Sequence, residues 1–228
     1  MIALVVTSVI SAILGLFATK PFEGSQLEAT KIGFFQPFIY TNDGYRLNPK
    51  FKVIEYLTGQ CRTPPSSEGS PDPDAGRCFA GDLILDPCWT SPSLAYAICP
   101  QYPWENSVRV VRFTEIPWNP PSPDSTAGVQ SPGDSSSMLD EARESWGVEI
   151  DRKYHGSNIR CFREQGASDN FIAGVRVGYR CIDPKHPDVA IGYVYGKLEK
   201  GSGDIWFCFY GHPGDSRTDQ VDVVNIWI

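Results

Sequence analysis

The chain has 228 residues and a mass of 25.3 kDa, enough for one ordinary domain or two small ones with a real hydrophobic core. Its formal net charge of -7 and sequence pI near 5.0 exclude sequence-independent nucleic-acid binding, which requires clustered Lys and Arg. The 21 Gly and 19 Pro interrupt helices and create turns, so the composition predicts short strands joined by loops, with little helix.

Residues 1–20 predict a membrane segment. No charged residue occurs from Ile2 to Phe17, and nearly every position is apolar. The run is slightly short for a spanning helix and somewhat long for the apolar part of a cleaved signal. We expect an uncleaved transmembrane anchor, because Pro21 disfavours cleavage just before it, with cleavage and secretion as the alternative. Either outcome places the remaining chain outside the cytoplasm. A third interpretation, a buried core helix of a soluble protein, is disfavoured because such a helix usually carries a polar face.

Beyond the anchor the sequence predicts a connector, 21–50, and an extracytoplasmic β-rich domain, 51–228. The connector contains Phe34, Phe35, Phe38 and Tyr40, which either pack onto the domain or lie at the membrane surface. The domain divides into two halves, 51–116 and 138–228. A Pro/Ser-rich segment at 117–137 joins them and lacks the apolar residues to order itself, so we expect a linker or long surface loop. The pattern of 138–146 allows one short helix.

The cysteines predict a disulfide framework. There are seven, at Cys61, Cys78, Cys88, Cys99, Cys161, Cys181 and Cys208. None is placed as Cys-x-x-Cys, and thiols behind an export segment meet an oxidising compartment. Sequence alone leaves the connectivity open, but neighbour pairing closes loops that contain turn residues. We therefore expect Cys61 with Cys78, Cys88 with Cys99 and Cys161 with Cys181, each worth roughly 3 kcal/mol in the chain-entropy model.

The seventh cysteine, Cys208, lies in an apolar run at 205–210 that is typical of a buried strand. A free thiol there behaves as a small hydrophobic residue. A catalytic thiol would instead need a histidine and a partly exposed, electropositive pocket. We expect a buried, unreactive Cys208.

Alternating and apolar runs predict the fold class: mainly β, with antiparallel strands and disulfide-stapled loops. A short strand at 83–85 is expected between turns at Gly81-Asp82 and Asp86-Pro87. In the run 174–181, Val175, Val177, Tyr179 and Cys181 share one parity and so one face. Further strand candidates are 108–116, 191–198, 205–210 and 221–228. Because short connections separate the last ones, they predict an antiparallel meander.

Several short motifs follow one another along the chain in an order that is also found in a known family of domains. They are Arg77-Cys78-Phe79-Ala80-Gly81, Asp86-Pro87-Cys88-Trp89, Cys99-Pro100, Pro103-Trp104, Ile159-Arg160-Cys161, the run 174–181 with its Tyr-x-Cys, Trp206, and Val221-x-Val223-x-x-x-Trp227. From about Gly59 onward the chain resembles an uncharacterised actinobacterial extracytoplasmic domain. The resemblance implies a secreted or membrane-attached protein, in some chains the outer part of a serine/threonine kinase receptor. No Lys or Arg stands before the apolar run, and one hypothesis is that a cytoplasmic part with basic residues precedes Met1. The resemblance would explain such a part. It implies no activity or ligand.

No catalytic, metal-binding or cofactor-binding residue is predicted. His155, His186 and His212 lie in loop-like segments without repeated ligand spacing, and the run 211–215 is expected to be a plain turn. The carboxylates of Asp72, Asp74, Asp82 and Asp86 lack the EF-hand spacing, so Asp82 and Asp86 are expected to cap turns.

Three tryptophans are candidate ligand-facing residues: Trp89, Trp104 and Trp118. Each flanks Pro or Cys in an irregular segment, where an aromatic side chain either fills a small core or forms a binding face. We expect a binding or sensing module without catalytic activity, tethered through 1–20, whose partner is a cell-envelope component or another protein. The alternatives are a secreted hydrolase with an unfamiliar site, which needs a cavity joining His155 or His212 to a carboxylate and a hydroxyl, and a passive structural domain, which lacks a concave aromatic patch.

Overall fold

The computed structural model describes residues 28–42, 44–62, 64, 67–70, 72–91, 95–114, 145–163, 171–172, 174–212 and 214–228. All regular elements in this part of the chain are strands, which confirms the prediction of a mainly β, antiparallel protein. The predicted anchor, the linker 117–137 and most of the predicted helix 138–146 lie outside the described residues. Trp146, at the end of that helix, is described and lies in a bend.

Across the residues described, no helix has the length and apolar character that a bilayer crossing requires.

The first β unit is a closed barrel of five strands. They are β4 (Lys52–Cys61), β5 (Ala75–Ala80), β6 (Leu83–Thr90), β7 (Tyr96–Pro100) and β8 (Ser107–Phe113). Neighbours are antiparallel except that β8 closes the barrel by pairing in parallel with β4. In β8, Val108 and Val110 are buried while Arg109 and Arg112 face outward, as expected for a strand with one wet side.

The second β unit is built from the C-terminal third of the chain. Its strands are β9 (Gly147–Tyr154), β10 (Ser157–Arg163), β11 (Phe171–Ile172), β12 (Val175–Asp183), β13 (His186–Lys200), β14 (Trp206–Gly211) and β15 (Asp219–Trp227). The run β12 to β15 is the predicted antiparallel meander, and β15 also pairs with β9. The core of this unit includes Val148, Ile159, Leu198, Trp206 and Ile226.

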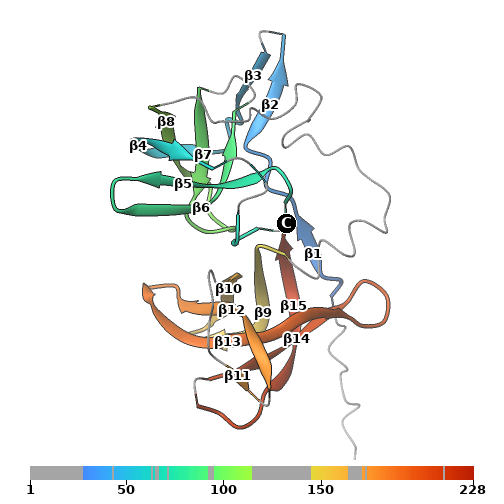
Figure 1. The fold of residues 1–228 in the computed structure, drawn as a ribbon. Coiled ribbons are helices and arrows are strands. Elements are labelled where there is room, and N and C mark those ends of the chain that lie inside the picture. Colours follow the sequence, from blue (N-terminus) through green and yellow to red (C-terminus); the bar gives the residue numbers. More distant parts are fainter. Residues whose placement is uncertain are drawn as a thin grey trace, which may run out of the picture.

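The described part of the connector packs onto both β units. Strand β1 (Lys31–Gly33) joins the second unit by pairing in parallel with β15. Strands β2 (Phe38–Thr41) and β3 (Gly44–Leu47) form a hairpin against the first unit, where Phe38 contacts Tyr96. Figure 1 shows the resulting arrangement, with the two units stacked and β1 crossing between them. Of the two alternatives for these aromatic residues, packing onto the domain is the one the structure supports for Phe34, Phe35 and Phe38, whereas Tyr40 is exposed on the hairpin.

Two local expectations need correction. The strand expected at 83–85 does not turn at Asp86-Pro87, because β6 continues through that dipeptide to Thr90 and keeps its pairing with β5. In β12, Val177, Tyr179 and Cys181 are buried as predicted, but Val175 is exposed at the start of the strand. The alternation of residues along the strand correctly predicted which face of β12 is buried. How far along the strand that face is buried depends on the neighbouring segments that cover it.

The three predicted disulfides are confirmed: Cys61–Cys78, Cys88–Cys99 and Cys161–Cys181. Each joins two strands of one unit, and two of them join directly facing residues of antiparallel strands. Cys208 is free and fully buried, as expected. These bridges indicate that the chain matures in an oxidising environment.

Candidate functional site

The two β units meet through a layer of aromatic side chains. Phe35, which precedes the hairpin, lies between Trp89 of the barrel and Trp146 of the second unit, with ring centroids 4.4 and 5.5 Å away. The contact is close elsewhere too, because a Cβ atom at Gly147 would lie 2.3 Å from Cγ of Pro103. Large rings and a glycine therefore hold the units in register at this junction.

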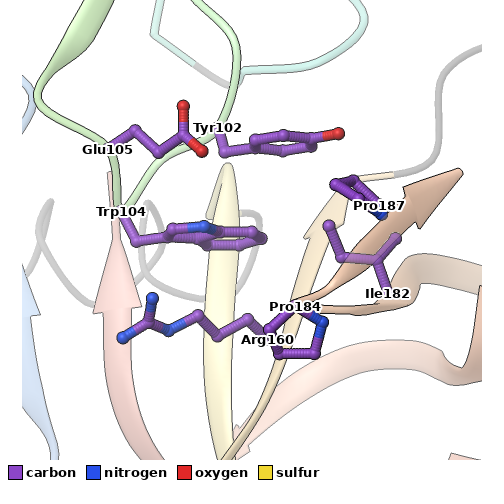
Figure 2. Close-up of a pocket in the computed structure, with 7 residues that line it drawn as sticks. All are labelled: Tyr102, Trp104, Glu105, Arg160, Ile182, Pro184 and Pro187. Carbon is purple, nitrogen blue, oxygen red and sulfur yellow. The ribbon is translucent and has the colours of Figure 1, made fainter.

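A pocket of about 240 Å³ opens at the same junction. The loop between β7 and β8 contributes Tyr102, Trp104 and Glu105, and β10 contributes Arg160. The end of β12 and the turn into β13 contribute Ile182, Pro184 and Pro187. The site, which we call the junction pocket, is lined by residues from both units (Figure 2).

One wall of the junction pocket is a stack of three planar groups. The rings of Tyr102 and Trp104 are parallel, with centroids 5.3 Å apart, and the guanidinium of Arg160 lies 5.8 Å from the Trp104 ring. Figure 2 shows Trp104 between Tyr102 and Arg160, with the Tyr102 ring displaced sideways, so the protein covers part of each face of the indole. The edges of the two rings point toward Ile182 and Pro187. The stack thus presents aromatic edges to the pocket.

Contacts outside the pocket hold this stack in place. Glu149 accepts hydrogen bonds from Nε of Arg160 at 3.1 Å and from Nδ2 of Asn158 at 2.9 Å. Trp104 packs edge-on against Trp227 of β15, with centroids 5.7 Å apart. Glu105 accepts a hydrogen bond from the Ser107 hydroxyl at 2.8 Å. The wall is therefore ordered before any ligand arrives, which lowers the entropic cost of binding.

The opposite wall depends on a tight turn after β12. The Asp183 carboxylate accepts a hydrogen bond from the Lys185 backbone N–H at 2.8 Å and lies 3.1 Å from Nδ1 of His186. These contacts, the backbone N–H first, lower the pKa of Asp183 against the opposing effect of its burial. This turn presents Pro184 to the pocket, and the start of β13 presents Pro187.

The lining favours an apolar group of about the size of one ring or one side chain. Ligand pockets for larger molecules measure about 300–1,000 Å³, so this site is small. Among the residues that the structure describes, its charged lining residues are Glu105 and Arg160, and none of the lining residues is a histidine, serine, threonine or cysteine. The site offers shape and aromatic contact rather than a nucleophile with its base.

The candidate tryptophans have different surroundings. Trp89 is 1% exposed and its Nε1 donates to Asp72 at 2.7 Å, so this side chain has no surface to offer a ligand and instead fills the core. Trp104 lines the junction pocket, and Trp118 lies outside the described residues. Sequence patterns missed Tyr102, Arg160 and the Pro184–Pro187 wall. A Tyr-Pro-Trp run in a loop was a usable signal, but the residues facing it come from strands more than fifty positions away.

The acidic residues weighed for calcium order a loop instead. Asp86 bonds to Arg77 at 2.8 Å, to the Ser67 hydroxyl and to the backbone N–H groups of Glu68 and Gly69. Asp72 accepts from the backbone N–H of Asp74 at 2.8 Å as well as from Trp89. Asp82, by contrast, is exposed in the turn between β5 and β6. These contacts fix the segment before β5 against the barrel.

The histidines lie in separate parts of the second unit, two of them in turns and His186 at the start of β13. His155 has a φ of 51° in the turn between β9 and β10, and His186 pairs with Asp183. His212 has its backbone N–H bonded to Asp215 and its Nδ1 2.8 Å from the Ile191 carbonyl oxygen. Among the described residues, neither His155 nor His212 lines the junction pocket, so the arrangement expected of a hydrolase is not seen there.

Comparison with protein families, with curated proteins and with solved structures finds no match to this chain. The resemblance to an actinobacterial extracytoplasmic domain therefore stays a prediction.

Proposed function

We propose that the protein is a non-catalytic extracytoplasmic binding module that receives an apolar side chain of a partner protein in the junction pocket. The carrying observation is the concave aromatic and proline lining shared by two disulfide-stapled units. A passive structural domain has no reason to keep a preformed, partly open aromatic pocket. A tether through residues 1–20 would hold the module at a membrane surface.

The lining favours a peptide over a glycan. A sugar ring would stack on an open aromatic face, but each face of Trp104 is partly occupied, one by Tyr102 and the other by Arg160. Slots bounded by aromatic edges and prolines suit a proline ring or another compact side chain, as in grooves that bind proline-rich segments. The ligand class is therefore an extended segment of a protein carrying proline or an aromatic residue.

A panel of extended peptides and a panel of envelope glycans, titrated by intrinsic tryptophan fluorescence, test the proposal. We expect saturable binding of peptides that contain proline or an aromatic residue. Trp104→Ala removes one wall, and Pro184→Ala alters the other wall without touching the contacts of Trp104, so both should weaken binding at least several-fold. Tyr40→Ala, which changes a residue 71% exposed on the β2–β3 hairpin, is the matched control.

Saturable glycan binding lost in Trp104→Ala would replace the peptide class by a carbohydrate. Equal responses of Trp104→Ala, Pro184→Ala and Tyr40→Ala to every peptide would remove the junction pocket as the site.

A further inference from the structure

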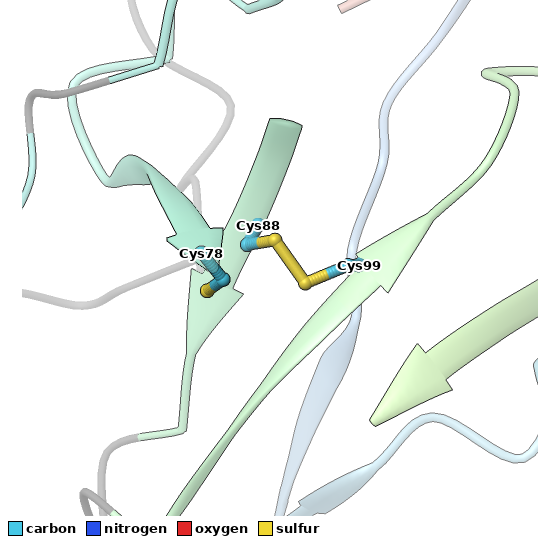
Figure 3. A group of neighbouring side chains, drawn as sticks. All are labelled: Cys78, Cys88 and Cys99. Atoms are coloured by element: carbon cyan, nitrogen blue, oxygen red, sulfur yellow. A yellow bond between two sulfur atoms is a disulfide. The ribbon is translucent and has the colours of Figure 1, made fainter. Parts of the chain in front are cut away.

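Four of the seven cysteines gather in the barrel as two neighbouring bridges. The Sγ atoms of Cys78, Cys88 and Cys99 all lie within 4.8 Å of one another, although Cys78 is bonded to Cys61. Figure 3 shows Cys78 of β5 beside the bridge that joins Cys88 to Cys99. In the described part of the chain, no other cysteines form such a group, so Cys161, Cys181 and Cys208 lack this arrangement.

The four cysteines differ in their exposure to solvent. Cys78, Cys88 and Cys99 are at most 1% exposed, whereas Cys61 is partly exposed at the end of β4. An external thiol would therefore reach the Cys61–Cys78 bridge from the Cys61 side, since the rate of exchange depends on access to the sulfur that is attacked.

We propose that Cys61 is a site of S-thiolation by small thiols and that the sulfur released at Cys78 then exchanges with the Cys88–Cys99 bridge. In the first step the incoming thiolate bonds to Cys61 Sγ, the Cys61–Cys78 bond breaks, and Cys78 leaves as the thiolate. In the second step Cys78 bonds to Sγ of Cys88 or Cys99, and the other of these two leaves and takes a proton. One disulfide is broken and one formed in each step, so no further oxidant or reductant is required.

Proximity favours the second step. The Sγ atoms of Cys88 and Cys99 lie within 4.8 Å of Cys78 Sγ, so the exchange needs no opening of the barrel. A buried thiolate is costly at each of these sulfur atoms, and the proton taken by the leaving sulfur removes that charge. The exchange affects the pairing of β4 with β5. Among the described residues, these two strands pair only at Gln60–Phe79 and Cys61–Cys78. Thiolation at Cys61 would thus release the covalent link across this short ladder.

The first experiment removes Cys61 and maps the remaining bridges. In Cys61→Ser, trapped with N-ethylmaleimide and digested without reduction, we expect peptides that join Cys78 to Cys88 or Cys99, with a free thiol at the third cysteine. The matched control is Cys161→Ser, which frees Cys181 with no third sulfur nearby and should leave both barrel bridges intact. An intact Cys88–Cys99 bridge beside a fully alkylated Cys78 would overturn the proposal.

The second experiment uses the folded wild-type protein and reduced glutathione as the probe, so that it does not depend on how a variant folds. We expect a glutathione adduct at Cys61, formed on the order of tenfold faster than any adduct at the buried Cys161 or Cys181. The adduct should be accompanied by a Cys78–Cys88 or Cys78–Cys99 bridge. Absence of an adduct, an adduct on Cys78, or equal reaction at Cys161–Cys181 would each contradict the assignment.

Discussion

At the scale of single residues, burial decides which side chains are accessible to a ligand or a reagent. Trp89 and Trp104 were both candidates because each follows a Cys or a Pro in a segment expected to be irregular, yet Trp89 is enclosed and Trp104 lines the junction pocket. The difference arises because Asp72 binds the Trp89 indole while Trp104 extends from a loop toward β10. Residue type and local sequence predicted three candidates, and only the packing of distant segments distinguishes the two that the structure describes.

Cys208 gives a residue-scale prediction. Its burial, with a smaller contribution from Asp222, raises the pKa of the thiol to about 12. We therefore expect no alkylation by iodoacetamide in the native protein at about pH 8, because the thiol is protonated and enclosed, and one modification per chain after unfolding. Intact-mass spectrometry measures both states. Rapid labelling of Cys208 in the folded protein would contradict its place in the core.

At the scale of elements, periodicity predicted the strands β12 to β15 of the second unit, whereas β9, β10 and β11 were not predicted. The run 174–181 placed Cys181 on the buried face, and β10 supplies Cys161 directly opposite. What the sequence could not predict is pairing between distant segments. The parallel contact of β4 with β8 and that of β1 with β15 join strands far apart in the chain, and no local pattern encodes such partners.

The same limit explains why the junction pocket was only partly anticipated. Trp104 was a candidate because of its own sequence context. The proline wall depends on the turn between β12 and β13, whose position relative to the β7–β8 loop is fixed by the packing of two units. The aromatic connector illustrates the same point, since Phe35 and Phe38 have no period yet pack firmly.

The β12–β13 turn gives an element-scale prediction about pH. Because the pKa of Asp183 is lowered in the folded state, its carboxylate stabilises the fold above the unfolded pKa of about 3.9, and this contribution is lost as the pH falls through the folded value. Asp183→Asn should therefore be less stable than wild type at about pH 6, with the difference shrinking toward about pH 2.

Urea unfolding at both pH values measures the effect. Asp188→Asn, at an exposed site in β13, is the control and should show little difference at either pH. A difference between Asp183→Asn and wild type that stays constant with pH would show that the turn does not depend on the charged form.

At the scale of the whole molecule, the stacking of the two units creates the junction pocket. The units approach each other closely at Gly147, where an added Cβ would lie 2.3 Å from Pro103 and 3.1 Å from the Cys161 carbonyl oxygen. Gly147→Ala should therefore cost about 1–3 kcal/mol of unfolding free energy, as overpacking does in a tight interior. It should also weaken peptide binding at the pocket, because Pro103 lies between Tyr102 and Trp104.

Denaturant unfolding followed by tryptophan fluorescence checks this prediction. Gly201→Ala is the matched control, because its added Cβ would meet its nearest neighbour at 3.4 Å, an ordinary contact. Combining Gly147→Ala with Pro103→Ala removes the clashing ring and should recover part of the stability. Equal stability of Gly147→Ala and Gly201→Ala would show that the units do not meet as described.

The assigned compartment and the fold share one requirement, which is oxidation of six cysteines. The most direct test is peptide mapping of the protein isolated from its own cells, with thiols blocked before lysis and digestion without reduction. We expect the bridges Cys61–Cys78, Cys88–Cys99 and Cys161–Cys181, with the blocking reagent on Cys208 after denaturation. Recovery of folded protein with all seven cysteines blocked would contradict both the framework and the extracytoplasmic location.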